Sequence, residues 1–260
     1  MGILNVTPDS FSDGLLHFET DAAVSHGKTL IAQGADILDI GAESTRPGAD
    51  PVSAADELKR LLPVIEALRD SNIPLSIDTF KPQVMRRVLD AGVDMINDIY
   101  GFRQPGAIDA VAASRCGLCV MHMQGEPQTM QQAPSYNDPV EDVRKFLQGR
   151  LDELLNHGVQ PERILLDPGF GFGKTAAQNY ELLRRLAELR IGNYPWLVAL
   201  SRKSMIGHVT GRPPAERASG SIAGALAGIA RGAHMVRVHD VAATVDAVKV
   251  WQAIEHGVTE

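Results

Sequence analysis

The sequence lacks the features that mark several classes of protein. Its 260 residues include only two cysteines, too few for a disulfide framework. No apolar run approaches the ~20 residues that a membrane-spanning helix needs, and no secretory-type segment opens the chain. Basic runs are also absent, and 25 basic against 32 acidic side chains give a net charge of −7. We therefore expect a cytoplasmic protein that binds neither nucleic acid nor a membrane.

What the sequence does contain is a repeated alternation of short apolar runs, polar or glycine-rich loops, and amphipathic stretches. Hydrophobic residues make up 44% and charged residues 22%, as in ordinary globular proteins. The short runs are nearly continuous in Ile, Leu and Val, which is typical of strands in a buried parallel sheet. Eight strands are predicted, over residues 2–5, 37–41, 75–78, 95–98, 118–122, 164–167, 197–200 and 235–239. Helical spacing is clear over residues 22–33, 54–68, 82–90, 140–156, 178–187, 221–231 and 243–256.

Eight strands that alternate with helices indicate an α/β fold of the closed (β/α)8, or TIM barrel, type. The alternative is an open doubly wound sheet, which has fewer strands and a glycine-rich turn after its first strand. Here the turn over residues 5–14 is long and polar and has no G-x-G-x-x-G pattern. We predict the closed barrel, with residues 1–260 forming a single domain.

Polar or distinctive side chains follow every predicted strand. The active sites of such barrels lie at the carboxyl ends of the strands, so these residues would share one rim. A buried strand that ends in charged or amide groups also needs partners for them. The candidates, in chain order, include Asn5, Thr7, Asp9, Asp13, Thr45, Arg46, Pro47, Asp78, Asn97, Met121, Asp167, Phe172, Lys203, Ser204, Arg237 and His239.

The rim is chemically sorted. Asp78, Asn97 and Asp167 carry acceptors, and a carboxylate pairs well with the amidine-like edge of a flat, donor-rich heterocycle. The cationic candidates imply an anionic group such as phosphate. They are Arg46, Arg202, Lys203, Arg237 and His239.

Two motifs resemble known sites without meeting their requirements. Residues 169–175 read GFGFGKT, but a Walker A loop needs glycine where this chain has Pro168, which lacks the N–H that would face phosphate. A loop that brings Phe172 over a planar ligand is the better interpretation. Cys116 and Cys119 form a C-x-x-C that precedes and enters a strand, the wrong end for a redox pair. We expect two free thiols, with Cys119 packed in the barrel. His122 could be a ligand, a base or a satisfied core group.

Several long motifs resemble those of the dihydropteroate synthases, the pterin-binding barrel enzymes of folate synthesis. The opening GILNVTPDSFSDG and the later DIGAESTRPG and LDPGFGFGK are the longest of them. Together the motifs span essentially the whole chain. The matching segments are residues 2–14, 39–48, 78–79, 96–98, 121–124, 166–174, 201–204 and 236–240.

The resemblance implies a reaction. These enzymes join 4-aminobenzoate to 6-hydroxymethyl-7,8-dihydropterin diphosphate, giving 7,8-dihydropteroate and pyrophosphate with the help of Mg²⁺. Pyrophosphate leaves first, and the amine traps a pterin-methyl cation. Sulfonamides imitate aminobenzoate, so sensitivity to them is implied, as is a homodimer.

The resemblance also assigns roles to single residues. Asp78, Asn97 and Asp167 would hold the aminopyrimidine edge of the pterin, and Lys203 its carbonyl side. Met121 and Phe172 would form walls, and the carboxylates of Asp13 and Asp78 would stabilise the developing cation. Asn5 would coordinate Mg²⁺. A diphosphate clamp would comprise Arg46, Arg237 and His239. An aminobenzoate pocket would comprise Phe11, Thr45, Pro47 and Ser204.

The chain departs from the family pattern at Leu15 and Ala42, where glycine is common, and both changes spare the polar residues. Family members also carry residues ahead of the first strand that plug the barrel floor, so we expect either a trimmed start or a different closure here. Two alternatives share parts of the pattern. A methyltetrahydrofolate methyltransferase-type barrel would not need the diphosphate clamp, and a catalytically silent pterin-binding barrel would have lost rim residues.

Overall fold

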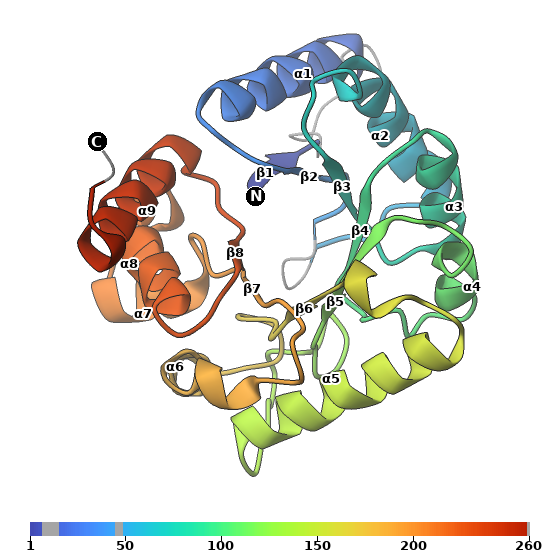
Figure 1. Ribbon diagram of the computed structural model, residues 1–260. Helices are drawn as coiled ribbons and strands as arrows, with labels where there is room; N and C mark the ends of the chain where they lie inside the picture. The colour runs from blue at the N-terminus through green and yellow to red at the C-terminus, as the bar shows by residue number, and fades with distance from the viewer. Residues whose placement is uncertain (7–15, 45–48, 259–260) are drawn as a thin grey trace.

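Short parallel strands form the inner wall of the molecule. The computed structural model describes residues 1–6, 16–44 and 49–258, and within these ranges it contains eight strands. They are β1 (Gly2–Asn5), β2 (Leu38–Gly41), β3 (Leu75–Asp78), β4 (Met95–Asp98), β5 (Gly117–Met121), β6 (Ile164–Asp167), β7 (Leu197–Val198) and β8 (Met235–Val236). Figure 1 shows them at the centre of a ring of helices.

The strands pair in parallel and close on themselves. Strands β1 to β6 form one sheet in chain order, and β7 pairs with β8. Two isolated bridges join these sheets, one between Leu166 and Trp196 and the other between Gly2 and Val238. The second join is reinforced by the terminal amine of Met1, which donates to Val236 at 3.0 Å. The closed order confirms the predicted (β/α)8 barrel.

The helices form the outer layer (Figure 1). The α-helices are α1 (Leu16–Ala32), α2 (Ala54–Leu68), α3 (Pro82–Asp90), α4 (Ala107–Val111), α5 (Pro139–Asn156), α6 (Ala176–Arg184), α7 (Ser204–Thr210), α8 (Ala218–Ile229) and α9 (Val241–His256). Short 3₁₀ turns are η1 (Pro161–Arg163), η2 (Leu186–Leu189) and η3 (Pro214–Glu216). Among the described residues, no helix combines the length and apolar character needed to cross a bilayer.

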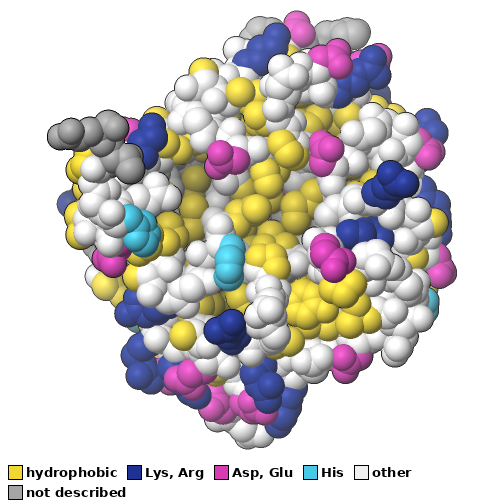
Figure 2. Space-filling view, in the orientation of Figure 1, with side chains coloured by type: hydrophobic (Ala, Val, Ile, Leu, Met, Phe, Trp, Pro, Cys, Tyr) yellow, Lys and Arg dark blue, Asp and Glu magenta, His cyan; other side chains and the backbone are white. Residues whose placement is uncertain are grey.

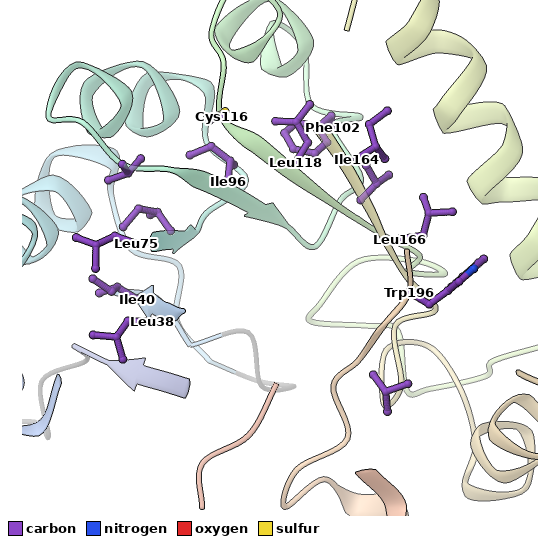
Figure 3. Packing of buried hydrophobic residues seen from close by; sticks show 14 of the residues in the cluster. Leu38, Ile40, Leu75, Ile96, Phe102, Cys116, Leu118, Ile164, Leu166 and Trp196 are labelled. Carbon is purple, nitrogen blue, oxygen red and sulfur yellow. The ribbon is translucent and has the colours of Figure 1, made fainter. Parts of the chain in front are cut away.

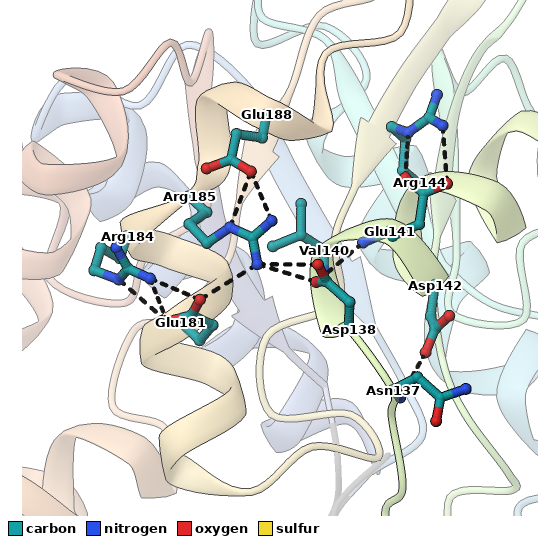
Figure 4. Close-up of polar contacts among 10 residues, drawn as sticks. All are labelled: Asn137, Asp138, Val140, Glu141, Asp142, Arg144, Glu181, Arg184, Arg185 and Glu188. Atoms are coloured by element: carbon teal, nitrogen blue, oxygen red, sulfur yellow. Dashed lines mark hydrogen bonds and ion pairs between the residues drawn. The ribbon is translucent and has the colours of Figure 1, made fainter.

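Side-chain signals in the sequence explain several helix starts. Ser53 accepts a hydrogen bond from the backbone N–H of Asp56 at the start of α2. Thr175 and Gln178 form a reciprocal capping box at the start of α6. Asp138 caps α5 and also pairs with Arg185, at 3.1 Å, beyond the end of α6 (Figure 4). The two helices are thereby linked at the surface.

Strand alternation separates two apolar layers. Outward-facing residues such as Ile40, Leu118 and Leu166 pack under the helices in the main core (Figure 3). A smaller cluster, made of Met1, Met95, Cys119, Leu165, Leu197 and Ala199, packs apart from it. Figure 2 shows hydrophobic side chains gathered in the hollow at the centre of one face. Because side chains of a strand alternate between faces, the residues on the inner face recur at every second position.

The observed elements differ from the predicted ones near both ends of the chain. The helix predicted over 22–33 begins earlier, at Leu16, and ends at Ala32. The predicted strands over 197–200 and 235–239 are only two residues long. After β7 the backbone turns, and the N–H of Lys203 donates to the carbonyl of Leu200. The predicted helix over 178–187 begins two residues earlier, at Ala176, and its end is a separate 3₁₀ turn. Helices α4 and α7 have five and seven residues, too short to show helical periodicity in the sequence.

Candidate active site

The inner-face residues at the carboxyl ends of the strands form a polar rim. Asp78 ends β3 and Asp167 ends β6, while Asn97 precedes the last residue of β4. The ladders pair Asp78 with Asn97 and Met121 with Asp167. The rim expected from the sequence is thus assembled on neighbouring strands of the six-stranded sheet.

A buried carboxylate organises one side of this rim. Asp39, on β2, is fully buried and accepts from the Ser76 hydroxyl at 2.6 Å and from Asn97 Nδ2 at 3.1 Å. Its Oδ2 also accepts from Arg237 Nε at 2.5 Å. Arg237 Nη2 donates to Asp78 at 2.9 Å, so one guanidinium joins two carboxylates. Burial raises the pKa of Asp78 to about 7, against the opposing effect of Arg237.

Asn97 presents an acceptor that the protein does not satisfy. Its Nδ2 is committed to Asp39, which fixes the orientation of the amide. Its Oδ1 is buried and has no hydrogen-bond partner in the described part of the chain. A buried acceptor without a partner costs free energy, so this oxygen is suited to a donor on a ligand.

Asp167 and Lys203 form the opposite side of the rim. Asp167 Oδ1 accepts from the backbone N–H of Gly169 at 2.7 Å, and burial raises the pKa of its carboxyl against the effect of Lys203. Lys203 Nζ donates to the carbonyl of Phe170 at 2.5 Å and lies 4.6 Å from the centre of the Phe172 ring. Burial lowers the pKa of Lys203 to about 8.

An apolar surface lies beside the polar groups. Met121 packs with other buried residues at the carboxyl ends of β4 and β5, and Phe172 packs against this cluster. The full cluster is Phe80, Ile99, Tyr100, Met121, Met123, Met130 and Phe172. Sulfur and aromatic faces of this kind suit a planar ring. Two members of this cluster, Phe80 and Tyr100, also line a cleft of about 270 Å³. Glu43 and Glu126 line the same cleft.

The remaining predicted residues divide into those that the structure describes and those that it does not. Asn5 is exposed at the end of β1, and Ser204 is exposed at the first position of α7. His239 Nδ1 lies 3.0 Å from the hydroxyl of Ser201. Arg202, another predicted cation, forms an ion pair with Asp240. Thr7, Asp9, Phe11, Asp13, Thr45, Arg46 and Pro47 lie outside the described residues.

Two interpretations of sequence motifs are confirmed. Cys116 and Cys119 are free, buried thiols, and Cys119 belongs to the small cluster that contains Met1. Lys174 is buried and contacts His122 at 2.9 Å, so residues 169–175 do not offer their lysine to a nucleotide. His122 is therefore a satisfied core group.

Sequence reasoning missed two charged groups, the buried Asp39 and the partly buried Lys81. Asp39 was named only as part of a motif, although a carboxylate inside an apolar strand is itself a signal of a polar network. Lys81 was not considered, yet its Nζ pairs with both Glu43 and Glu57, the second at 2.6 Å. Glu43 Oε1 also accepts from the backbone N–H of Val52 at 3.0 Å. These contacts join the segment after β2 to the start of α3.

A known protein family matches most of this chain. The profile of the family described as pterin binding enzyme matches residues 1–239. The chain is 49% identical to the dihydropteroate synthase of Escherichia coli (strain K12), over 97% of this chain and 90% of that protein. It is 49% identical to that of Haemophilus influenzae, over 97% of this chain and 92% of that protein.

Solved structures give the same result. The Burkholderia cenocepacia dihydropteroate synthase complexed with 7,8-dihydropteroate matches with a TM-score of 0.90 and 55% identity, over 98% of this chain and 90% of that chain. The Xanthomonas albilineans enzyme with 4-aminobenzoic acid matches with a TM-score of 0.91 and 52% identity, over 98% and 93%. The Yersinia pestis enzyme with a sulfonamide drug complex matches with a TM-score of 0.93 and 46% identity, over 98% and 93%.

Proposed function

The chain belongs to the pterin-binding enzyme family, among the dihydropteroate synthases, and from this premise we propose how its residues carry out that transferase reaction. The reaction condenses 4-aminobenzoate with 6-hydroxymethyl-7,8-dihydropterin diphosphate. Neither the methyltransferase-type barrel nor the silent barrel is supported by a separate observation.

The pterin lies between the acceptors of the six-stranded sheet and Lys203. Its aminopyrimidine edge donates to the carboxylates of Asp78 and Asp167 and to Oδ1 of Asn97, while Lys203 donates to its carbonyl. The single observation that carries this assignment is the buried, unpartnered Oδ1 of Asn97, held in place by the Asp39 contact to its Nδ2. Met121 and Phe172 provide the walls.

Charged groups around the methylene carbon of the pterin assist the breaking of its bond to the diphosphate. The bond between this carbon and the diphosphate oxygen breaks, and the diphosphate leaves with the electron pair. The carboxylates of Asp78 and Asp13 stabilise the pterin-methyl cation electrostatically. The amine nitrogen of aminobenzoate then forms the new C–N bond and releases a proton. Arg46, Arg237 and His239 bind the diphosphate, and two of the five N–H donors of Arg237 are directed to Asp39 and Asp78.

Asn5 fits Mg²⁺ only together with substrate. Its amide is exposed at the mouth of the barrel, and the described residues contain no group of three or more His, Cys, Asp or Glu side chains that could hold a metal alone. Mg²⁺ typically uses one or two protein oxygens together with waters and substrate phosphates. When bound, the ion would neutralise charge on the departing diphosphate. Asn5 then orients the diphosphate at the end of β1.

Aminobenzoate binds between Phe11, Thr45, Pro47 and Ser204. The support comes from the exposed position of Ser204 after β7 and from the homologue that binds 4-aminobenzoic acid. Sulfonamides compete for this pocket, as the complex of the Yersinia pestis enzyme with such a drug supports. Residues 1–260 act as one domain, and two copies form a homodimer.

The test follows pyrophosphate release and dihydropteroate formation from dihydropterin diphosphate, aminobenzoate and Mg²⁺. We expect Asp167→Asn and Lys203→Ala to abolish turnover while the far-ultraviolet circular dichroism stays unchanged. Matched controls replace the same residue types on the exposed side of α5, as Asp152→Asn and Lys145→Ala, and keep full activity. Full activity in both rim variants would remove the assignment. Chelation of Mg²⁺ should stop release, and its return should restore it.

A further inference from the structure

Lys174 is a buried lysine, with a pKa that burial lowers to about 7, that the proposed reaction does not use. The residue is 2% exposed and follows the loop after β6. Its Nζ lies 2.8 Å from the carbonyl oxygen of Gly169, 3.1 Å from that of Phe172 and 2.9 Å from Nδ1 of His122. Three acceptors match the three N–H donors of a lysine ammonium. The side chain therefore connects the loop after β6 with the residue after β5.

His122 completes this arrangement as a neutral acceptor. Burial, and then the charges of Lys174 and Arg103, hold the pKa of His122 well below its ordinary value. A neutral ring with its proton on Nε2 leaves Nδ1 free to accept from Lys174. The ring is held edge-on to Phe146, with centroids 4.8 Å apart. The acceptor is thus fixed in position before any ligand binds.

The loop is shaped to wrap around this amine. Gly169, Gly171 and Gly173 have φ angles of +69°, +81° and +59°, which side chains rarely adopt. A Cβ at Gly169 would lie 1.8 Å from the carbonyl oxygen of His122, and one at Gly173 would lie 2.5 Å from that of Gln124. The loop therefore lies directly against the segment that follows β5, with Lys174 filling its inside.

The other side of the same loop faces the candidate active site. The backbone N–H of Gly169 donates to Asp167, and the carbonyl of Phe170 accepts from Lys203. The Phe172 ring lies under the Lys203 ammonium. Three groups assigned to the pterin pocket thus depend on the course of one short loop.

We propose that Lys174 is a positioning residue for the pterin pocket. It acts through the carbonyl groups of Gly169 and Phe172 and through the ring of His122, and it sets where Lys203 and Phe172 stand. Lys174 does not touch the substrate. The inference rests on the proposed function, because it assigns Lys203 and Phe172 to pterin binding.

Loss of Lys174 should displace the loop rather than unfold it. Asn179 Oδ1 accepts from the backbone N–H of Gly171 at 2.7 Å, and the Tyr136 hydroxyl donates to the carbonyl of Gly173 at 2.8 Å. These contacts hold the loop from positions other than that of Lys174. In Lys174→Met the apolar part of the side chain remains, and only the three hydrogen bonds and the charge are lost.

The experiment compares Lys174→Met with Arg163→Met in steady-state kinetics. Arg163 is a matched control because its guanidinium binds backbone carbonyls, those of Val111, Ala112 and Cys116, ahead of β6 at the opposite end of the barrel. We expect Lys174→Met to raise KM for the pterin diphosphate about tenfold with a smaller change in kcat, as loss of ground-state binding does. Arg163→Met should lower the melting temperature and leave KM unchanged.

A second readout follows Lys203 itself. Its ammonium faces Asp167 on β6, Arg237 after β8 and Asp78 on β3, and burial lowers its pKa. Lys174 is a like charge near Lys203, so Lys174→Met raises the pKa of Lys203 even if the loop does not move. His122→Leu keeps that charge, so a shift of the alkaline limb of kcat/KM to higher pH in His122→Leu reports the solvent that Lys203 gains when the loop moves away. A change that only destabilises the fold, as in Arg163→Met, should leave this limb where it is.

Variants of His122 keep the proposal testable if Lys174→Met does not fold. His122→Asn keeps an acceptor near the position of Nδ1, whereas His122→Leu removes it. We expect the asparagine variant to retain a KM near that of the unaltered chain, and the leucine variant to raise KM and shift the limb. An unchanged KM and limb in folded Lys174→Met or His122→Leu would overturn the proposal, and so would identical changes in Arg163→Met. If the unaltered chain formed no dihydropteroate, the proposed function itself would fail instead.

Discussion

Arg237 and Asp39 stand 198 positions apart in the chain and meet inside the barrel, where Arg237 Nε lies 2.5 Å from Asp39 Oδ2. Asp39 belongs to β2, and Arg237 directly follows β8. The pair therefore ties the six-stranded sheet to the β7–β8 pair across the mouth of the barrel. It also orients the Asn97 amide, since that side chain donates to the same Asp39 oxygen.

Removing the Asp39 carboxylate should destabilise the fold. In Asp39→Ala the Ser76 hydroxyl, the Asn97 amide and part of the Arg237 charge lose their acceptor. We expect the free energy of unfolding to fall by about 3 kcal/mol, the lower end for a broken buried ion pair, because Asp78 still pairs with Arg237. Urea unfolding measures this change. Glu181→Gln, in the exposed network of Figure 4, is the control and should change stability little. Equal losses in the two variants would contradict the expectation.

Two glycines with the same φ angle allow the cost of backbone strain to be measured apart from the cost of a steric clash of an added Cβ. Gly169 and Gly211 both have φ +69°, but a Cβ at Gly211 meets nothing within 4 Å, while one at Gly169 meets the His122 carbonyl at 1.8 Å. Gly211→Ala should cost only the strain of a left-handed residue, about 1 kcal/mol. Gly169→Ala should cost about 3 kcal/mol or more, because backbone must move. Chemical denaturation of both variants under one set of conditions is decisive, and similar costs would show that the loop yields freely.

Activity should decline in alkaline solution because Lys203 loses its proton. Burial lowers the pKa of this ammonium to about 8, so its protonated fraction falls as the pH rises through that value. We expect kcat/KM for the pterin diphosphate to decrease above about pH 8. Lys203→Arg should lower kcat/KM but remove this limb, since arginine stays charged in proteins. A limb that persists unchanged with arginine would assign it to another group.

The effect of removing Lys81, which pairs with Glu43 and Glu57, on the free energy of unfolding should depend on pH. Glu57 is 1% exposed, and burial raises its pKa against the hydrogen bond from Lys81. Lys81→Met should lower the free energy of unfolding by about 3 kcal/mol, because the buried carboxylate of Glu57 and the partly buried carboxylate of Glu43 lose their cation. A raised pKa stabilises the fold at low pH, and this contribution is lost as the pH rises through the folded value. The penalty should therefore be smaller at pH 5 than at pH 8.

A second substitution checks the cause of that penalty. Glu57→Gln in the Lys81→Met background removes one uncompensated charge, so the double variant should recover part of the lost stability. If the double variant were as unstable as Lys81→Met at both pH values, charge burial would not explain the loss. Thermal melts at the two pH values are sufficient to decide this.

The fold was predictable because its signal repeats. Each strand reads as a short apolar run, so β1, β3, β4 and β6 have the predicted bounds. The period of two along a strand also determines that Asp78 and Asn97 face the same interior. The length of the short β7 could not be predicted, because its end depends on a turn at Leu200 and Lys203.

The site was predictable where a strand carries it and less so where a loop does. The positions of Asp78, Asn97 and Asp167 follow from strand ends, whereas the pairing of Arg202 with Asp240 depends on loop geometry. The contacts of Lys174 depend on three glycines with positive φ at alternate positions of one loop, Gly169, Gly171 and Gly173. No periodic pattern in the sequence predicts the conformation of such a loop. The burial of Asp39 was visible in the sequence as a charge within an apolar strand.

The two isolated bridges that close the barrel have a consequence for its motion. Continuous ladders join β1 to β6, whereas in the described residues one isolated bridge on each side, together with the Met1 amine and the ion pairs of Arg237, connects β7 and β8 to the rest of the wall. Local opening favours the least-bonded unit of a fold, so the amide protons of β7 and β8 should exchange with solvent before those of the six-stranded sheet. Asp78, Asn97 and Asp167 belong to the larger unit, and Lys203, Arg237 and His239 follow strands of the smaller one. A pterin diphosphate that contacts both groups would cross-link the two units and slow that exchange.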